Sequence, residues 1–150
     1  MRPSFKIKIA KNMRIVIIED IVQDLLFYRP LTEKERDISL VFLTHDAEFT
    51  KDKLKELVEF TSEDMRHAIK NYYVVNKENI LSFFDANHFD FFIVDSLGGL
   101  GEQLAHDIPF LPGMGVFVSS TSEFRNIMIE QGYRAYPKDE VEKLISDCGL

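Results

Sequence analysis

Short runs of apolar residues alternate along this chain with longer segments in which apolar residues recur every three or four positions. A short, continuously apolar run is typical of a strand that is buried on both faces of a parallel sheet. The pattern predicts strands over Arg14–Ile18, Ile38–Leu43, Tyr72–Val75, Phe91–Asp95, Val116–Val118 and the more polar Tyr133–Tyr136, with an extra edge strand over Phe5–Ile9.

The segments between these runs carry the helical period or the residues that begin and end helices. We expect helices over Lys51–Phe60, after a capping box at Thr61–Asp64, around Ile80–Phe84 behind a cap at Asn76, over Glu102–His106, through Phe124–Met128 up to Gly132, and over Val141–Cys148, with a proline- and glycine-rich loop at 109–115. Strands that alternate with helices predict an α/β fold: a doubly wound parallel sheet, flavodoxin-like, with helices on both faces.

Composition limits the classes of function. The chain has 150 residues, 45% of them hydrophobic, which suits a single domain with its own core. A net charge of −7 argues against direct nucleic-acid binding, because phosphate contacts need clustered lysine and arginine. No apolar run is long enough to cross a bilayer, so no membrane partner is expected. The single cysteine, Cys148, and a start that resembles a strand more than a signal peptide predict a cytoplasmic protein.

Polar residues follow the predicted strands where each of them ends. They are Glu19 and Asp20, Asp95, Ser119, and Lys138. The carboxyl ends of parallel strands meet at one crevice, so we expect these side chains to converge. Carboxylates crowded together repel one another unless a cation joins them, and Mg²⁺ suits such a set. Asp95 is the candidate nucleophile for a phosphoryl group, because its strand is central and the glycines that follow leave room above it.

Four segments together resemble the receiver domain of bacterial two-component response regulators. They are RIVIIED (14–20), YVVNKENILSFFDANHFDFFIVD (73–95), VFVSS (116–120) and GYRAYPK (132–138). The first resembles the family's first strand with its acidic pair. The second resembles the second strand, second helix and phosphoacceptor strand, and the last two resemble the fourth and fifth strands. The resemblance covers about two-thirds of the chain.

The resemblance implies a role for each of the polar residues at the strand ends. Mg²⁺ would be held by Glu19, Asp20, Asp95 and the backbone carbonyl of Leu97. Asp95 would accept a phosphoryl group from a histidine kinase or a phosphotransfer protein. Ser119 and Lys138 would bind that group, and Tyr136 would switch rotamer. The chain would then act in a phosphorelay by changing a surface that a downstream protein, or a second copy of the chain, recognises. Any catalysis would be limited to phosphorylation and dephosphorylation of Asp95.

Three features depart from the family pattern. Asp20 and Asp95 are 75 positions apart, which predicts an insertion of a strand and helices at about residues 31–66 in an otherwise single receiver-like domain. Lys138 follows Pro137 and lies one position early, and a shift of one residue on a strand turns a side chain to the other face. The stretch after Asp95 also lacks the usual proline.

These departures leave two other functions open. The first is an atypical pseudo-receiver that binds partners without phosphorylation. The second is a phosphatase of the haloacid dehalogenase type, which is disfavoured because Leu97 stands where a general acid belongs. Simpler structural roles also remain open: Asp20 could cap a helix over Ile21–Phe27, and Ser119 could begin the next helix. The four histidines have no metal-ligand spacing.

Overall fold

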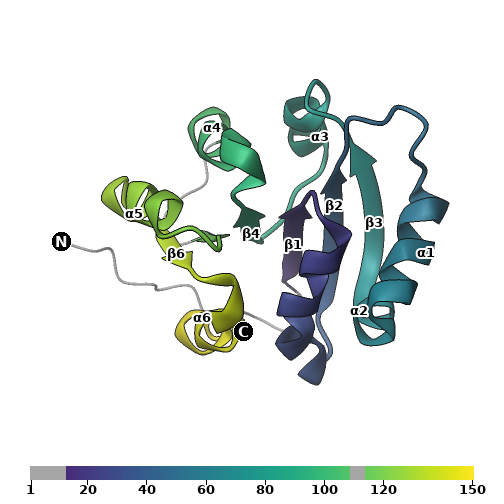
Figure 1. The fold of residues 1–150 in the computed structure, drawn as a ribbon, viewed down its shortest axis with the longest axis horizontal. Coiled ribbons are helices and arrows are strands. Elements are labelled where there is room, and N and C mark those ends of the chain that lie inside the picture. The colour runs from purple at the N-terminus through teal and green to yellow at the C-terminus, as the bar shows by residue number, and fades with distance from the viewer. Residues whose placement is uncertain (1–12, 109–113) are drawn as a thin grey trace.

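The computed structural model describes residues 13–108 and 114–150. All strands in these ranges belong to one parallel sheet, which Figure 1 shows with β3 and β6 at its edges. In chain order they are β1 (Arg14–Glu19), β2 (Asp37–Leu43), β3 (Ile69–Val75), β4 (Phe91–Asp95), β5 (Gly115–Val118) and β6 (Arg134–Tyr136). The predicted extra strand over Phe5–Ile9 and most of the predicted 109–115 loop lie outside the described residues.

The strands lie in the order β3-β2-β1-β4-β5-β6, and every neighbouring pair is parallel. This order is flavodoxin-like, with one more strand at the β3 edge, and it confirms the predicted fold class. The chain moves outward from β1 to β3 and then crosses back to β4. The order therefore reverses between β1 and β4, the position at which ligands bind in doubly wound sheets.

Helical segments connect the strands. The α-helices are α1 (Lys51–Thr61), α2 (Glu63–Ala68), α3 (Ile80–Ala86), α4 (Leu100–Asp107), α5 (Ser122–Glu130) and α6 (Val141–Cys148), and the 3₁₀ helices are η1 (Val22–Glu33), η2 (Leu97–Gly99) and η3 (Lys138–Glu140). The predicted helices are confirmed to within a few residues, and Ser62 caps α2 through a bond from the Met65 N–H. Asn76 accepts a bond from the Asn79 N–H in the turn before α3, so it does not cap the helix itself.

The sheet is covered on both faces, and alternate residues of β1 enter separate cores. Ile15 and Ile17 pack with η1, α1, α2 and α6. Val16 and Ile18 pack with α3, α4 and α5. This alternation follows from the two-residue period of a strand, and it explains why β1 is a continuous apolar run. We call the first side the η1 face and the second side the α5 face.

The segment after β1 forms a long 3₁₀ helix. Its buried residues are Val22, Leu25, Tyr28 and Leu31, which lie three positions apart. A 3₁₀ helix has three residues per turn, so this spacing places all four on one stripe against the sheet. Because this stripe is buried, the hydrophobic effect stabilises the segment in a geometry that is less common than the α-helix.

One expected correspondence is wrong. The segment from Tyr73 was expected to hold the place of the second strand, beside β1. That place belongs to β2, whose Ile38 pairs with Ile15, while β3 lies outside β2 at the edge. The segment 31–66 contains the end of η1, β2, α1 and part of α2, so a strand of this segment lies inside the sheet rather than at its edge.

No helix among the described residues is long and apolar enough to span a membrane.

The connection from β4 to α4 is tight because the chain turns back on itself. Gly101, in the first turn of α4, lies so close to the end of β4 that an added Cβ would be 2.6 Å from the Asp95 carbonyl oxygen and 3.0 Å from that of Ser96. The Gly101 N–H also donates to the Ser96 carbonyl, at 2.9 Å. Only a residue without a side chain permits this approach, which fixes the backbone that carries Asp95.

We therefore expect Gly101→Ala to lower the free energy of unfolding by about 1–3 kcal/mol, because the added methyl group must displace backbone atoms. Chemical denaturation would measure the change. Gln103→Ala, an exposed change on the same helix, is the control and should alter stability by less than about 0.5 kcal/mol. Equal stability of the Gly101 variant and the control would contradict the close contact.

Candidate functional site

Two carboxylates lie side by side where the strand order reverses. Glu19 ends β1, and Asp95 ends β4. Ile18 pairs with Val94 in the ladder, so the two acidic residues are neighbours at the carboxyl edge. Ile17 and Ile93 precede them by two positions and lie in the core of the η1 face, so both carboxylates project to that face. Both side chains are buried, Glu19 at 0% and Asp95 at 3% exposure.

Asp20 completes an acidic triad with these two residues. One carboxylate oxygen from each of Glu19, Asp20 and Asp95 lies within 4.8 Å of the others. Glu19 Oε1 accepts bonds from the backbone N–H groups of Asp20 and Ile21, at 3.0 and 3.3 Å. Glu19 Oε2 and Asp20 Oδ1 are buried and accept no hydrogen bond from any described residue. Since Asp20 makes no side-chain cap to η1, the simple capping role is not observed.

Lys138 supplies the positive charge at this site. Its Nζ lies 2.7 Å from Asp95 Oδ1 and 4.0 Å from Glu19 Oε2, and it also pairs with Asp24 Oδ2. The lysine begins η3 directly after Pro137, outside the strand, so the strand rule of alternating faces does not apply to it. The side chain therefore reaches Asp95 although Lys138 lies one position early.

The environment changes the proton affinity of these groups. Burial, and then the Asp95 charge, raise the pKa of Glu19 to about 9, although Lys138 acts in the opposite direction. Burial also raises the pKa of Asp20. Burial alone would lower the pKa of Lys138, but its bonds to Asp24 and Asp95 and the charge of Glu19 outweigh that effect and raise it. The ammonium therefore stays charged, while Glu19 is protonated at neutral pH unless a further cation joins the triad.

The loop after β4 holds the second oxygen of Asp95. The Leu97 N–H donates to Asp95 Oδ2 at 2.9 Å. Leu97 has a φ of +52°, a left-handed conformation that a non-glycine residue adopts only when its surroundings enforce it. Its carbonyl accepts the Leu100 N–H. The metal-ligand role predicted for the Leu97 carbonyl stays a prediction.

Ser119 lies at the end of β5, but its hydroxyl group faces the start of α5. It accepts a bond from the Thr121 N–H at 3.1 Å and lies 3.1 Å from the Thr121 hydroxyl. In the alternation of β5, Val118 enters the η1 face and Phe117 the α5 face, so Ser119 shares the side of Phe117. Ser120 instead lines a cavity of about 480 Å³ with Lys138 and Arg125. The role predicted for Ser119 stays a prediction.

Tyr136 is buried on the η1 face, and its hydroxyl group lies 3.0 Å from Asp147 Oδ2 on α6. The ring thus connects the edge strand β6 to the last helix. A change of rotamer would break this bond and open a gap in the core. The switch role predicted for Tyr136 has a physical connection to α6 here, and it stays a prediction.

Two residues near the triad were not predicted from the sequence. Asp24 pairs with Lys138, and both it and Tyr28 lie on η1. Tyr28 is fully buried, its hydroxyl group has no hydrogen-bond partner among the described residues, and its pKa is raised by burial and by the charges of Glu19, Asp95 and Asp24. The three-residue period Val22, Leu25, Tyr28, Leu31 is a sequence signal that could have placed Tyr28 against the sheet. Asp24 is not part of that period, so no local signal in the sequence indicates its pair with Lys138.

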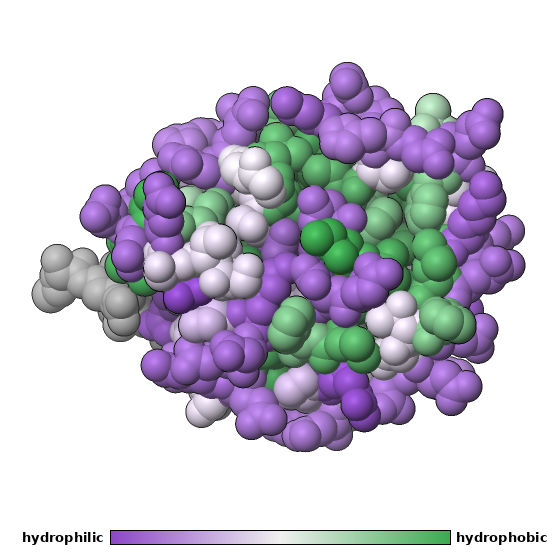
Figure 2. All heavy atoms as spheres, viewed as in Figure 1, coloured by the Kyte–Doolittle hydropathy of each residue, from purple (hydrophilic) through white to green (hydrophobic). Residues whose placement is uncertain are grey.

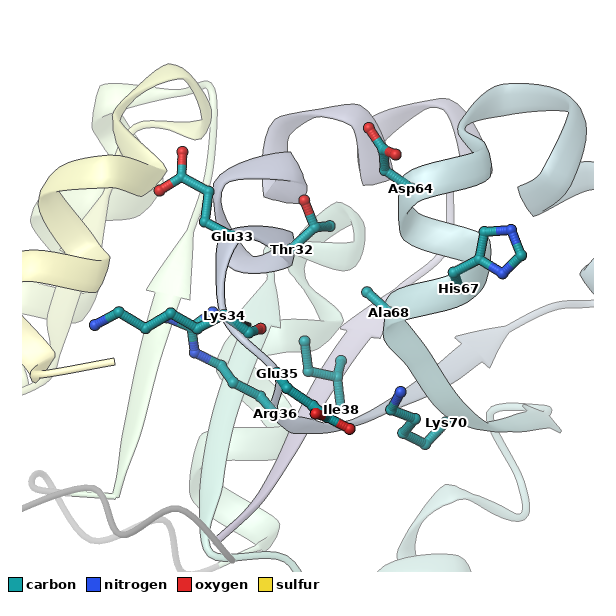
Figure 3. Close-up of a pocket in the computed structure, with 10 residues that line it drawn as sticks. All are labelled: Thr32, Glu33, Lys34, Glu35, Arg36, Ile38, Asp64, His67, Ala68 and Lys70. Atoms are coloured by element: carbon teal, nitrogen blue, oxygen red, sulfur yellow. Dashed lines mark hydrogen bonds between the residues drawn. The ribbon is translucent and has the colours of Figure 1, made fainter.

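A second cavity, of about 320 Å³, lies near the end of η1 and the beginnings of β2 and β3, at the amino edge of the sheet. Figure 3 shows its lining: Lys34 and His67 point to opposite sides, and Glu33 and Asp64 extend away from the centre. Its acidic and basic groups do not converge on one point, unlike those around Asp95. The carboxyl edge is therefore the better candidate for chemistry.

The donor set of the triad fits a divalent cation. Mg²⁺ binds oxygen ligands, usually one or two carboxylates together with waters and phosphate oxygens. Buried carboxylate oxygens without hydrogen-bond donors are costly, and a cation would satisfy them. Lys138 beside Asp95 could in addition balance negative charge on a group bound to that aspartate.

Comparisons of this chain with models of protein families, with curated proteins and with solved structures found no match. The candidate site therefore rests on its own geometry. That geometry is an acidic triad and a buried lysine at the carboxyl edge of a doubly wound sheet.

The raised pKa of Glu19 predicts how stability depends on pH. In the unfolded chain Glu19 loses its proton near pH 4.5, but in the folded protein it keeps the proton to about pH 9. Between these values the folded state binds more protons, so the Glu19 contribution lowers the free energy of unfolding as pH rises, by at most about 1.4 kcal/mol per unit. Denaturation in EDTA at pH 5.5, 7 and 8.5 should show this slope, and Glu19→Gln should reduce it. Equal slopes in both proteins would contradict the prediction.

The unpaired hydroxyl group of Tyr28 generates a second prediction. An unsatisfied buried donor costs about 1–3 kcal/mol, so removing it should not destabilise the protein. We expect Tyr28→Phe to leave the free energy of unfolding equal or higher in urea denaturation. Tyr72→Phe is the control: that hydroxyl group donates to the Arg66 carbonyl at 3.0 Å, and its loss should cost about 0.5–1.5 kcal/mol. A larger loss for Tyr28→Phe than for the control would show that a bound group pairs with Tyr28.

Proposed function

We propose that this protein is a phosphoacceptor domain of the receiver type, which takes a phosphoryl group onto Asp95 with the help of Mg²⁺. The observation that carries the proposal is the position of Asp95. Its carboxylate ends a central strand at the reversal point, between two further carboxylates and a lysine whose Nζ is 2.7 Å away. A carboxylate that attacks phosphorus needs a cation to reduce repulsion and a positive group for the oxygens that gain charge.

The residues divide these tasks in the proposed reaction. Asp95 Oδ1 forms a bond to phosphorus as the bond from phosphorus to the donor breaks, and the donor leaves with that electron pair. The donor is a phosphohistidine, as on a histidine kinase or phosphotransfer protein, or a small acyl phosphate. Glu19, Asp20 and the Leu97 carbonyl would hold Mg²⁺, which supplies charge neutralisation when bound. Lys138 would then pair with an oxygen of the phosphoryl group.

The surface beside the site suits a protein partner. Ile21, which precedes η1, and Leu26 and Phe27 on η1 are 40–47% exposed. Phe27 also lines the cavity that contains Lys138. Figure 2 shows apolar residues among hydrophilic ones on the face that contains η1. Apolar side chains near a reactive carboxylate favour a macromolecular phosphodonor, which can bury them, over a free metabolite. A downstream partner would read the phosphorylated form.

The test is intact-mass analysis after incubation with Mg²⁺ and acetyl phosphate. We expect one phosphoryl adduct on the wild-type protein, stable in acid and labile in base, and no adduct on Asp95→Asn or after EDTA. Asp85→Asn, an exposed aspartate on α3, is the matched control and should be phosphorylated like the wild type.

The opposite outcome is equally informative. If the wild type gains no adduct, the phosphoacceptor function is overturned, and a melting temperature that Mg²⁺ does not change would in addition count against the cation site. The geometry would then support a pseudo-receiver that binds partners through a fixed surface. An adduct that persists on Asp95→Asn would place the modification elsewhere and contradict the assignment of Asp95.

A further inference from the structure

Asp24 differs from the other carboxylates of the site. It lies on η1 and pairs with Lys138, from which it is 114 positions distant in the chain. It does not belong to the group whose oxygens lie within 4.8 Å of one another, which consists of Glu19, Asp20 and Asp95. Its side chain is 20% exposed, whereas that of Glu19 is fully buried. Asp24 therefore pairs with the ammonium from the more exposed side, and the triad lies on its other side.

The position of Lys138 in the chain explains why such a partner is needed. The lysine begins a 3₁₀ turn after Pro137, so no strand ladder directs its side chain. A lysine side chain has four rotatable bonds and loses much conformational entropy when fixed. Two carboxylates from different elements, Asp24 on η1 and Asp95 on β4, fix the ammonium between them.

Charge gives a second reason. A divalent cation bound by the triad would lie close to an ammonium that is 2.7 Å from Asp95 Oδ1 and 4.0 Å from Glu19 Oε2, and the two positive charges would repel each other. A carboxylate on the side away from the triad offsets this repulsion. It keeps the lysine at the site while Asp95 engages the cation or a phosphoryl group.

We propose that Asp24 is a positioning residue that holds the ammonium of Lys138 beside Asp95, so that Lys138 can pair with the phosphoryl oxygens during transfer. This inference rests on the proposed function and deepens it. Asp24 acts through Lys138 and does not bind the cation. Two consecutive segments thus contribute carboxylates with different tasks. The end of β1 supplies Glu19 and Asp20 as cation ligands, and η1 supplies Asp24 as the partner of the lysine.

The test measures the rate of Asp95 phosphorylation by acetyl phosphate at saturating Mg²⁺. Removing one such stabilising group commonly costs 10²–10³-fold, so we expect Lys138→Met to slow the reaction by about 100-fold. Asp24→Asn, which leaves Lys138 in place but unpaired on one side, should slow it by about 10-fold. Asp24→Glu should restore at least half of the rate. Asp139→Asn removes the same charge next to Lys138 in sequence, from an exposed residue, and should change the rate by less than about twofold.

A double-mutant cycle separates this role from a general effect of charge or stability. If Asp24 acts through Lys138, adding Asp24→Asn to the Lys138→Met variant should change the rate by less than about twofold. An equal 10-fold loss in both backgrounds would overturn the inference. So would a loss that disappears when the Mg²⁺ concentration is raised, because Asp24 would then act on the cation.

Whether the wild-type protein gains a phosphoryl adduct distinguishes a failure of the proposed function from a failure of the role proposed for Asp24. Absence of an adduct on the wild-type protein overturns the proposed function, and this role of Asp24 with it. An adduct on the wild type, together with an unchanged rate for Asp24→Asn, overturns the inference about Asp24 alone.

Discussion

The site depends on one ammonium group that is held among buried carboxylates. Glu19 and Asp95 are almost without contact with solvent, and each would be costly there as an isolated anion. Lys138 compensates part of this cost, and because its pairs join β4 and η1 to the η3 turn, it also connects segments that are far apart in the chain. One lysine cannot neutralise three or four carboxylates. Burial, and then the charge of Asp95, raise the pKa of Glu19, and a divalent cation bound by the triad would favour its ionised form.

The alternation of side chains between the two faces of the sheet decides which strand residues reach this ammonium. Glu19 and Asp95 lie two positions after Ile17 and Ile93, so their side chains point to the same η1 face of the sheet. Ser119 follows the opposite phase and turns to Thr121. The alternation does not apply to Lys138, because β6 ends at Tyr136 and the lysine begins a 3₁₀ turn. The composition of the site therefore depends on where each strand stops as much as on which residues follow it.

The sequence was sufficient to predict the α/β class, the strands within the described ranges and the acidic strand ends, because each depends on a local pattern. Short apolar runs such as Phe91–Val94, which are too short for a helix, favour buried strands, and the carboxyl ends of parallel strands meet in any such sheet. The neighbour of β1 was predicted wrongly, since nothing local distinguishes the strand over Ile38–Leu43 from the one over Tyr72–Val75. The pair of Asp24 with Lys138 joins residues 114 positions apart through side chains, and a local pattern contains no information about it.

The strand order by itself leaves several chemistries open. The order β3-β2-β1-β4-β5-β6 is shared with dinucleotide-binding domains, in which a glycine-rich turn after the first strand presents backbone N–H groups to a pyrophosphate. Here that turn is Glu19-Asp20-Ile21, and the side chain of Glu19 already occupies the N–H groups of the next two residues. An anion that approached the end of β1 would therefore meet the acidic side chains of the triad, and the N–H groups of Asp20 and Ile21 already donate to Glu19. Among the described residues at this edge, Lys138 is the positive group that contacts Asp95, and a cation bound by the triad would add further positive charge. The proposed transfer to Asp95 follows from this arrangement, because Asp95 belongs to the triad and also contacts the lysine.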